Sequence, residues 1–109
     1  MKALHIQLQP GLAPGFDAVA EVERLRGVIA ASGLAGPIRV TEGDDDGPYI
    51  NLDFDTADVS AMWSRLRHEW QPGGSLAGGS IVCCEGNLGW DDYRLLHHFD
   101  PSEPLDEAA

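Results

Sequence analysis

The feature that most constrains this chain is the strict alternation of side chains from Tyr49 to Phe54. Ile50, Leu52 and Phe54 are apolar, and the residues between them are polar or amphipathic. Successive side chains of a β-strand point to opposite faces, so the pattern predicts a strand with one face buried and the other in water. The same period of two recurs over residues 4–8, and the chain should therefore build a one-sided sheet. The outer face of this sheet would carry His5, Gln7, Arg39, Thr41, Tyr49, Asn51 and Asp53.

Two other stretches show helical spacing. The first predicts a helix over residues 16–32 with Gly33 as its C-cap. Its apolar face would consist of Phe16, Val19, Ala20, Val22, Leu25, Val28, Ile29 and Ser32. The second helix has the stronger stripe, and Asp55 or Thr56 should cap its N-terminus. That stripe consists of Val59, Met62, Trp63, Leu66 and Trp70. Each helix thus has an apolar face to bury against the sheet.

The last part of the chain predicts a β-hairpin. Residues 81–85 and 93–99 are short apolar runs, and Gly86, Asn87 and Gly89 lie between them. With a short strand at 38–41 and an acidic loop at 42–48, the expected order is β-α-β-β-α-β-β. This order predicts an α+β domain of the ferredoxin-like, split βαβ type, with a mostly antiparallel sheet and two helices on one face. Residues 1–100 would form this domain, and residues 101–109 an acidic tail that is mobile or lies across the surface.

Acidic residues dominate the charge of the protein. Among 109 residues, 18 acids face 7 bases, for a net charge of −11, and the pI is near 4.4. Nucleic acid and anionic membranes would both repel such a protein, so neither is expected as a direct partner. The longest apolar runs are too short to span a membrane, the N-terminal residues lack the apolar core of a signal peptide, and two adjacent cysteines do not form a disulfide framework. We therefore expect a cytoplasmic protein.

The cysteines and histidines of the last hairpin raise the question of a metal site or a reactive thiol. Cys84, His97 and His98, together with Cys83, have the ligand types that zinc prefers. Adjacent strand residues point to opposite faces, however, so only one Cys and one His could share a face. Neighbouring acids would also raise the pKa of a thiol. Burial of one cysteine in the core is the simpler interpretation, and no cofactor is expected.

Recognition of a protein partner is the function that the acids and aromatics favour. Acids gather in the loop at 42–46 and again after Trp90, where that tryptophan is expected in a hairpin loop. Aromatic side chains supply desolvated contact, and acids speed the encounter with a basic partner. The competing interpretation is that Trp90 only covers the hairpin and that the acids are merely solvated. The residues expected to bind the partner are Asp44, Asp45, Asp46, Tyr49, Trp90, Asp91, Asp92 and Tyr93.

These observations predict a small, non-enzymatic bacterial binding protein. Its most concrete form is an immunity protein or antitoxin that neutralises a cationic toxin. The alternative is a small enzyme or a ligand- or metal-binding domain of ferredoxin-like shape. Its site would use His5, His97 or His98, Cys84 and Tyr49, on the open sheet face or the last hairpin. A homodimer through the open sheet face is compatible with either hypothesis.

Overall fold

The computed structural model describes residues 2–12, 17–44, 47–70, 80–100 and 102–106. Within these residues the chain forms five strands, two α-helices and a short 3-10 turn, η1. In chain order they are β1 (Lys2–Leu8), η1 (Pro10–Leu12), α1 (Ala18–Ala31), β2 (Arg39–Asp44), β3 (Pro48–Thr56), α2 (Val59–Trp70), β4 (Ser80–Gly86) and β5 (Gly89–His97). The expected order β-α-β-β-α-β-β is therefore present.

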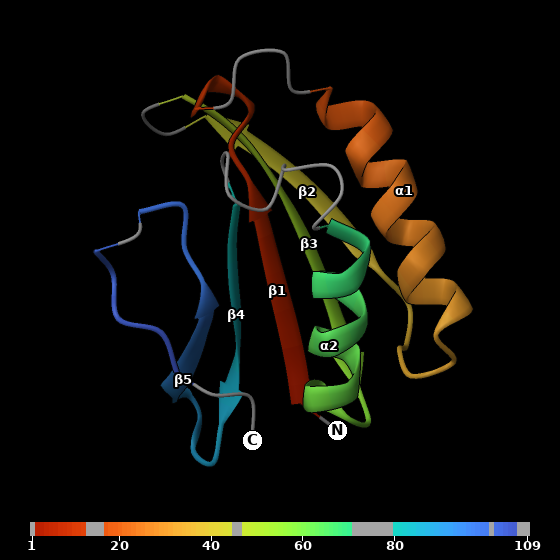
Figure 1. The fold of residues 1–109 in the computed structure, drawn as a ribbon, viewed down its shortest axis with the longest axis vertical. Helices are drawn as coiled ribbons and strands as arrows, with labels where there is room; N and C mark the ends of the chain where they lie inside the picture. The colour runs from red at the N-terminus through yellow and green to blue at the C-terminus, as the bar shows by residue number, and fades with distance from the viewer. Residues whose placement is uncertain (1, 13–16, 45–46, 71–79, 101, 107–109) are drawn as a thin grey trace.

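The five strands form one sheet in the order β2-β3-β1-β4-β5, and every neighbouring pair is antiparallel. β1 lies at the centre, and Figure 1 shows both helices in front of the same face of the sheet. β1 and β2 run parallel with β3 between them, and the connection through α1 crosses that strand. β3 and β4 are related in the same way through α2, with β1 between them. The prediction of an α+β protein with an antiparallel sheet and two helices on one face is confirmed.

The core lies between the sheet and the two helices. The alternation that predicted the strands is confirmed, because Leu52 and Phe54 are fully buried while Asp53 between them is not. The side chains that fill the core include Leu4, Ile6, Leu8, Val22, Leu25, Ile29, Leu52, Phe54, Met62, Leu66, Val82 and Leu96. The opposite side of the sheet, which we call the open face, carries the polar residues of each strand.

The helices differ from expectation in two respects, the N-cap of α2 and the first turn of α1. Asp58, and not Asp55 or Thr56, caps α2, since its Oδ1 accepts the backbone N–H of Ala61 at 3.0 Å. Thr56 is the last residue of β3 and its side chain is buried, whereas Asp58 directly precedes α2 and is better placed for this bond. Val19 and Ala20 were expected in the apolar face of α1, but both are exposed, Val19 to 74%. They lie in the first turn of that helix, before the residues that reach the sheet.

The last hairpin is tighter than the sequence suggested. Strand β5 begins at Gly89 rather than at residue 93, and only Asn87 and Leu88 form the turn. Gly89 has a φ of 74°, a left-handed conformation that glycine adopts readily. The pairing of β4 with β5 is irregular at two places, between Val82 and Cys83 and between Cys84 and Gly86.

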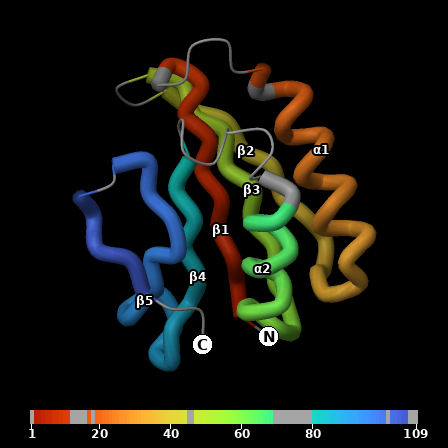
Figure 2. The backbone as a smooth tube through the Cα atoms, viewed as in Figure 1, coloured from red at the N-terminus to blue at the C-terminus, as the bar shows by residue number. Residues whose placement is uncertain are grey.

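The segment after β5 turns back along this edge strand (Figure 2). The backbone N–H of Asp106 donates to the carbonyl oxygen of Leu95 at 2.7 Å, and its carboxylate accepts the Leu95 N–H at 2.8 Å. Residues 102–106 of the expected tail thus lie across the surface against β5, which is one of the two alternatives for this segment. No helix in the described ranges is long and apolar enough to cross a membrane.

Candidate functional site

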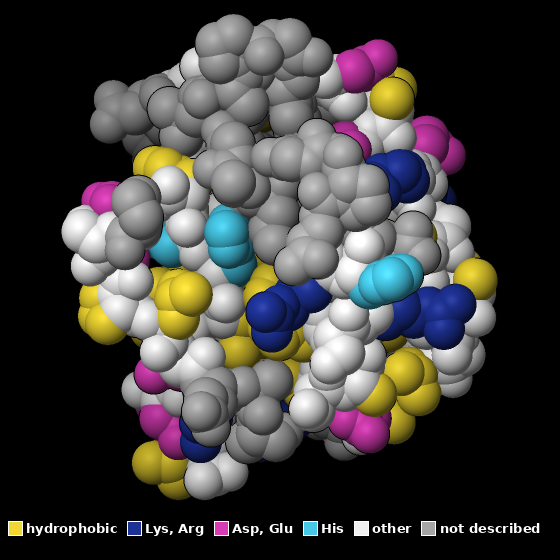
Figure 3. Space-filling model, viewed as in Figure 1, with side chains coloured by type: hydrophobic (Ala, Val, Ile, Leu, Met, Phe, Trp, Pro, Cys, Tyr) yellow, Lys and Arg dark blue, Asp and Glu magenta, His cyan; other side chains and the backbone are white. Residues whose placement is uncertain are grey.

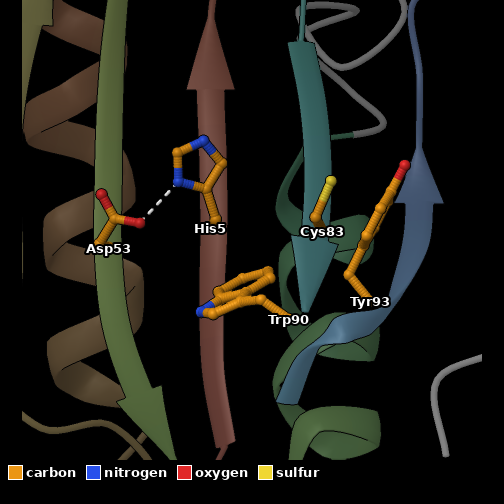
Figure 4. A pocket seen from close by; sticks show the side chains of 5 residues that line it. All are labelled: His5, Asp53, Cys83, Trp90 and Tyr93. Carbon is orange, nitrogen blue, oxygen red and sulfur yellow. Dashed lines mark hydrogen bonds and ion pairs between the residues drawn. The ribbon is translucent and has the colours of Figure 1, made fainter. Parts of the chain in front are cut away.

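A depression of about 400 Å³ lies on the open face, on the side of the sheet away from the helices (Figure 4). Side chains from four strands line it: His5 from β1, Asp53 from β3, Cys83 from β4, and Trp90 and Tyr93 from β5. We call the space that these five residues line the open-face depression. It is shallow and open to solvent, and it has the size of a site for a small molecule or one long side chain.

The sheet register brings the first three side chains into one row. His5 is directly opposite Asp53 on β3 and Cys83 on β4, so the three side chains lie side by side on the open face. His5 Nδ1 lies 2.6 Å from Asp53 Oδ1, a distance typical of a strong hydrogen bond. Both side chains are about one-quarter exposed. The carboxylate fixes the orientation of the imidazole and leaves Nε2 as the ring nitrogen that can meet a ligand.

The break in the pairing of β5 brings Trp90 and Tyr93 to the same site. Residues three apart in a regular strand point to opposite faces. Between the pairs Cys84–Arg94 and Gly86–Gly89, one residue of β4 faces four of β5, so the strand bulges and both aromatic rings reach the depression. Trp90 is 47% exposed and Tyr93 is 57% exposed. In Figure 4 the indole extends across β4 to β1, while the Tyr93 ring borders the other side of Cys83.

Asp92 holds the bulge in place. Its Oδ1 accepts the backbone N–H of Leu88 at 2.7 Å, and its Oδ2 accepts the N–H of Asn87 at 3.0 Å. Gly86 lies against this residue so closely that a Cβ there would overlap the Asp92 carbonyl oxygen. The Asp92 carboxylate, expected at a partner surface, therefore binds the turn that positions Trp90 and Tyr93.

Cys83 is a poor nucleophile at neutral pH. Burial, with a smaller contribution from the neighbouring Cys84, raises the pKa of its thiol to about 11. Burial also raises the pKa of Cys84, whose side chain packs in the core on the helix side of the sheet. The thiol that faces the depression is thus neutral, and it contributes a polarisable, weakly polar wall.

The structure separates the predicted partner-binding residues into two groups. Tyr49 belongs to the first, near Asp44 at the β2–β3 end of the sheet, where its ring covers Gly43 so closely that a Cβ could not fit. Asp44 accepts a hydrogen bond from Gly47 N at 3.3 Å in the same turn. Asp45 and Asp46 lie outside the described residues. The second group consists of Trp90, Asp91, Asp92 and Tyr93 on β5, at the opposite edge of the sheet.

The candidate metal ligands, which the sequence did not favour as a site, do not converge. Cys84 is buried on the helix side, and His98 Nδ1 accepts the backbone N–H of Asp100 at 3.0 Å. The His98 ring also stacks on Phe99, with ring centroids 4.5 Å apart. His97 is paired with Val82 in the strand register. Among the residues that the structure describes, no group of three or more His, Cys, Asp or Glu side chains could hold a metal ion.

Sequence reasoning placed His5 and Asp53 on the outer face but did not pair them, and it chose Cys84 instead of Cys83. The missing information is the long-range register that joins β1 to β3 and β4. The sequence of β4 could have indicated the correct cysteine, because Cys83 alternates in phase with the acidic Glu85, and Cys84 with the apolar Val82. The bulge in β5 has no comparable sequence signal.

Basic and acidic groups are distributed unequally over the molecule. Figure 3 views the helix side, where dark-blue Lys and Arg atoms gather over the helices and acids lie towards the rim. The bases on the helices are Arg24, Arg26, Arg65 and Arg67. The open face therefore holds few of the seven basic residues, while the protein as a whole is strongly acidic.

The chain matches no protein-family model, and it shows no significant similarity to any curated protein or solved structure.

Proposed function

We propose that this protein is a binding module that holds a basic protein partner through the open face. The observation that supports this most directly is the pair of half-exposed aromatic side chains, Trp90 and Tyr93, which line one depression together with Asp53. Large aromatic side chains are enriched among the residues that dominate binding energy at protein interfaces. The net charge of −11 would attract a cationic partner from a distance and raise the rate of encounter.

The architecture fits this role. We take the strand order β2-β3-β1-β4, with both helices on one face, as a ferredoxin-like split βαβ sandwich that β5 extends at one edge. An antiparallel sheet covered on one side leaves its other face for docking. In its most specific form the proposal is an immunity protein or antitoxin, acting in the cytoplasm and neutralising a cationic toxin.

The test is affinity capture with matched variants. Immobilised protein should retain one basic protein in stoichiometric amount, and high salt should weaken the complex. Trp90→Ala should lose this partner, whereas Val19→Ala should keep it, because Val19 is 74% exposed but lies on α1, away from the open face. Circular dichroism of each variant checks that it is folded. If Trp90→Ala captures as much of the partner as the unmodified protein does, the proposed site is wrong.

A small-molecule or catalytic function is the second candidate, and the contact between His5 and Asp53 favours it. A carboxylate that orients an imidazole is a common arrangement for general acid–base chemistry. The neutral state of the Cys83 thiol argues against a thiolate nucleophile at this site. Loss of a measured turnover in His5→Gln and Asp53→Asn, with Trp90→Ala affecting mainly substrate affinity, would support this candidate over a purely binding role.

A further inference from the structure

We propose that the open-face depression binds a single cationic side chain, the guanidinium of Arg or the ammonium of Lys, from the basic partner. The inference rests on the proposed function and names the group that the site recognises. Trp90 would present its ring face to the cation, Tyr93 would border the stem of the side chain, and Asp53 would supply the counter-charge. Asp53 lies on β3 and Tyr93 on β5, with β1 and β4 between them, so the bound side chain would span the depression with its charged end towards Asp53.

The aromatic rings carry the first part of the argument. The face of an indole or phenol ring is electron-rich and attracts a cation within about 6 Å of its centroid. Figure 4 shows the Tyr93 ring and the Trp90 indole bordering one space above Cys83 and β1. At partly exposed sites each such contact strengthens binding by about 2- to 5-fold. Neither ring has its surface covered by the core, since each is about half exposed.

The charges around the depression carry the second part. Asp53 contacts His5 through Oδ1, and the depression has no Lys or Arg among its five lining residues. Arg39 is the basic residue directly opposite Asp53 in the register of β2 and β3, on the side away from His5. Arg39 therefore places one positive charge on the neighbouring strand, outside the depression. Asp53 and the net negative charge of the protein would repel an anionic ligand, so we assign the site to a cation.

The shape of the site favours a side chain over a larger ligand. The depression is shallow and lies on a sheet face that a partner protein can approach directly. An extended Lys or Arg can lay its methylene groups against Tyr93 and the neutral Cys83 while its charged end reaches Trp90 and Asp53. The apolar stem of the side chain thus meets the apolar wall of the depression, and its charged tip meets the carboxylate of Asp53.

The experiment is an NMR titration of the intact protein with small blocked amino acids. The probes are N-acetyl-arginine methylamide and N-acetyl-lysine methylamide with a free ε-amine, and the neutral isostere is N-acetyl-citrulline methylamide. The signals to follow are the Trp90 indole N–H, assigned with Trp90→Phe, and the backbone amides of Cys83 and Tyr93. The cationic probes should shift these signals and bind about 10-fold more tightly than the citrulline probe. Added salt should lower the affinity of the cationic probes.

Two charge variants sharpen the test. Asp53→Asn should weaken binding of the arginine probe by about 3- to 10-fold, while Glu23→Gln should change it little. Both remove one negative charge, but Glu23 lies on α1, away from the depression. Arg39→Gln should strengthen binding of the probe by about 2- to 3-fold, because a positive charge near Asp53 is lost. Citrulline binding as tightly as arginine, or equal effects of Asp53→Asn and Glu23→Gln, would overturn the assignment.

The outcomes separate this inference from the proposed function. If Trp90→Ala loses the captured basic partner but the cationic probes do not shift the Trp90 signal, the partner is held without a cation in the depression and the inference fails alone. If the probes bind as expected but no basic protein is captured, the cation site stands and the protein-binding function fails.

Discussion

Trp90 and Tyr93 lie on the same face of the sheet although they are three positions apart along the chain. In a regular strand this odd spacing would place one ring in the core and the other in solvent. The irregular pairing between Cys84 and Gly86 removes the conflict, and Asp92 stabilises the turn beside it. The site therefore depends on a local backbone feature as much as on the aromatic residues themselves.

Replacing Asp92 should damage the site without touching its lining. Asp92→Ala removes two hydrogen bonds to backbone N–H groups and should lower the free energy of unfolding by about 1–2 kcal/mol. The emission of Trp90 should also shift to longer wavelength as the bulge loosens, measured in a Trp63→Phe, Trp70→Phe background. Asp91→Ala is the matched control and should change neither quantity. Equal urea midpoints for the two variants would show that the turn does not depend on Asp92.

Glycine at position 86 is required by close packing, and glycine at position 27 is not. A Cβ at Gly86 would overlap the carbonyl oxygen of Asp92, whereas a Cβ at Gly27 meets no atom within 4 Å. Gly86→Ala should therefore destabilise the protein. Gly27→Ala lies inside α1 and should stabilise it by about 0.5–1 kcal/mol, since alanine is the better helix former. Urea denaturation of both variants measures this difference, and two shifts of the same sign would contradict it.

Much of this fold follows from local patterns. The alternation at residues 49–54 assigns Leu52 to the core and Asp53 to the open face, and both assignments are confirmed. The two helices and the element order follow from periodicity in the same way. These predictions succeed because burial of an apolar face dominates the energy of each element.

The site could be predicted only in part. The outer-face parity of His5 and Asp53 was visible in the sequence, but their contact depends on pairing between strands that are 48 residues apart. The bulge of β5 depends on the Asp92 contacts with Asn87 and Leu88 and on the close approach to Gly86. Hydrophobic patterns do not encode such polar and steric details, so Trp90 was expected in a loop and not on the open face.

Cys83 should react slowly with alkylating reagents at neutral pH. A pKa raised to about 11 lowers the thiolate fraction about 100-fold relative to a thiol with a pKa of 9.0. The higher nucleophilicity of a more basic thiolate offsets part of this, so iodoacetamide should react about 10-fold more slowly. The rate should keep rising towards pH 11, with the modified cysteine identified by tandem mass spectrometry and folding checked at each pH. Cys83→Ser is the control, and a rate that levels off near pH 9 would contradict the raised pKa.

Asp106 should protect the outer edge of the sheet. It bonds to Leu95 in both directions, as a backbone donor and as a carboxylate acceptor, on a strand with no neighbour beyond it in the described sheet. Asp106→Ala removes the acceptor, so the Leu95 amide should exchange its hydrogen about 10-fold faster or more. Asp106→Asn keeps a carbonyl oxygen at that place and should retain most of the protection. The Leu52 amide, on strand β3 inside the sheet, should exchange at the same rate in all three proteins. Unchanged exchange at Leu95 in Asp106→Ala would show that the segment after β5 does not hold this edge in solution.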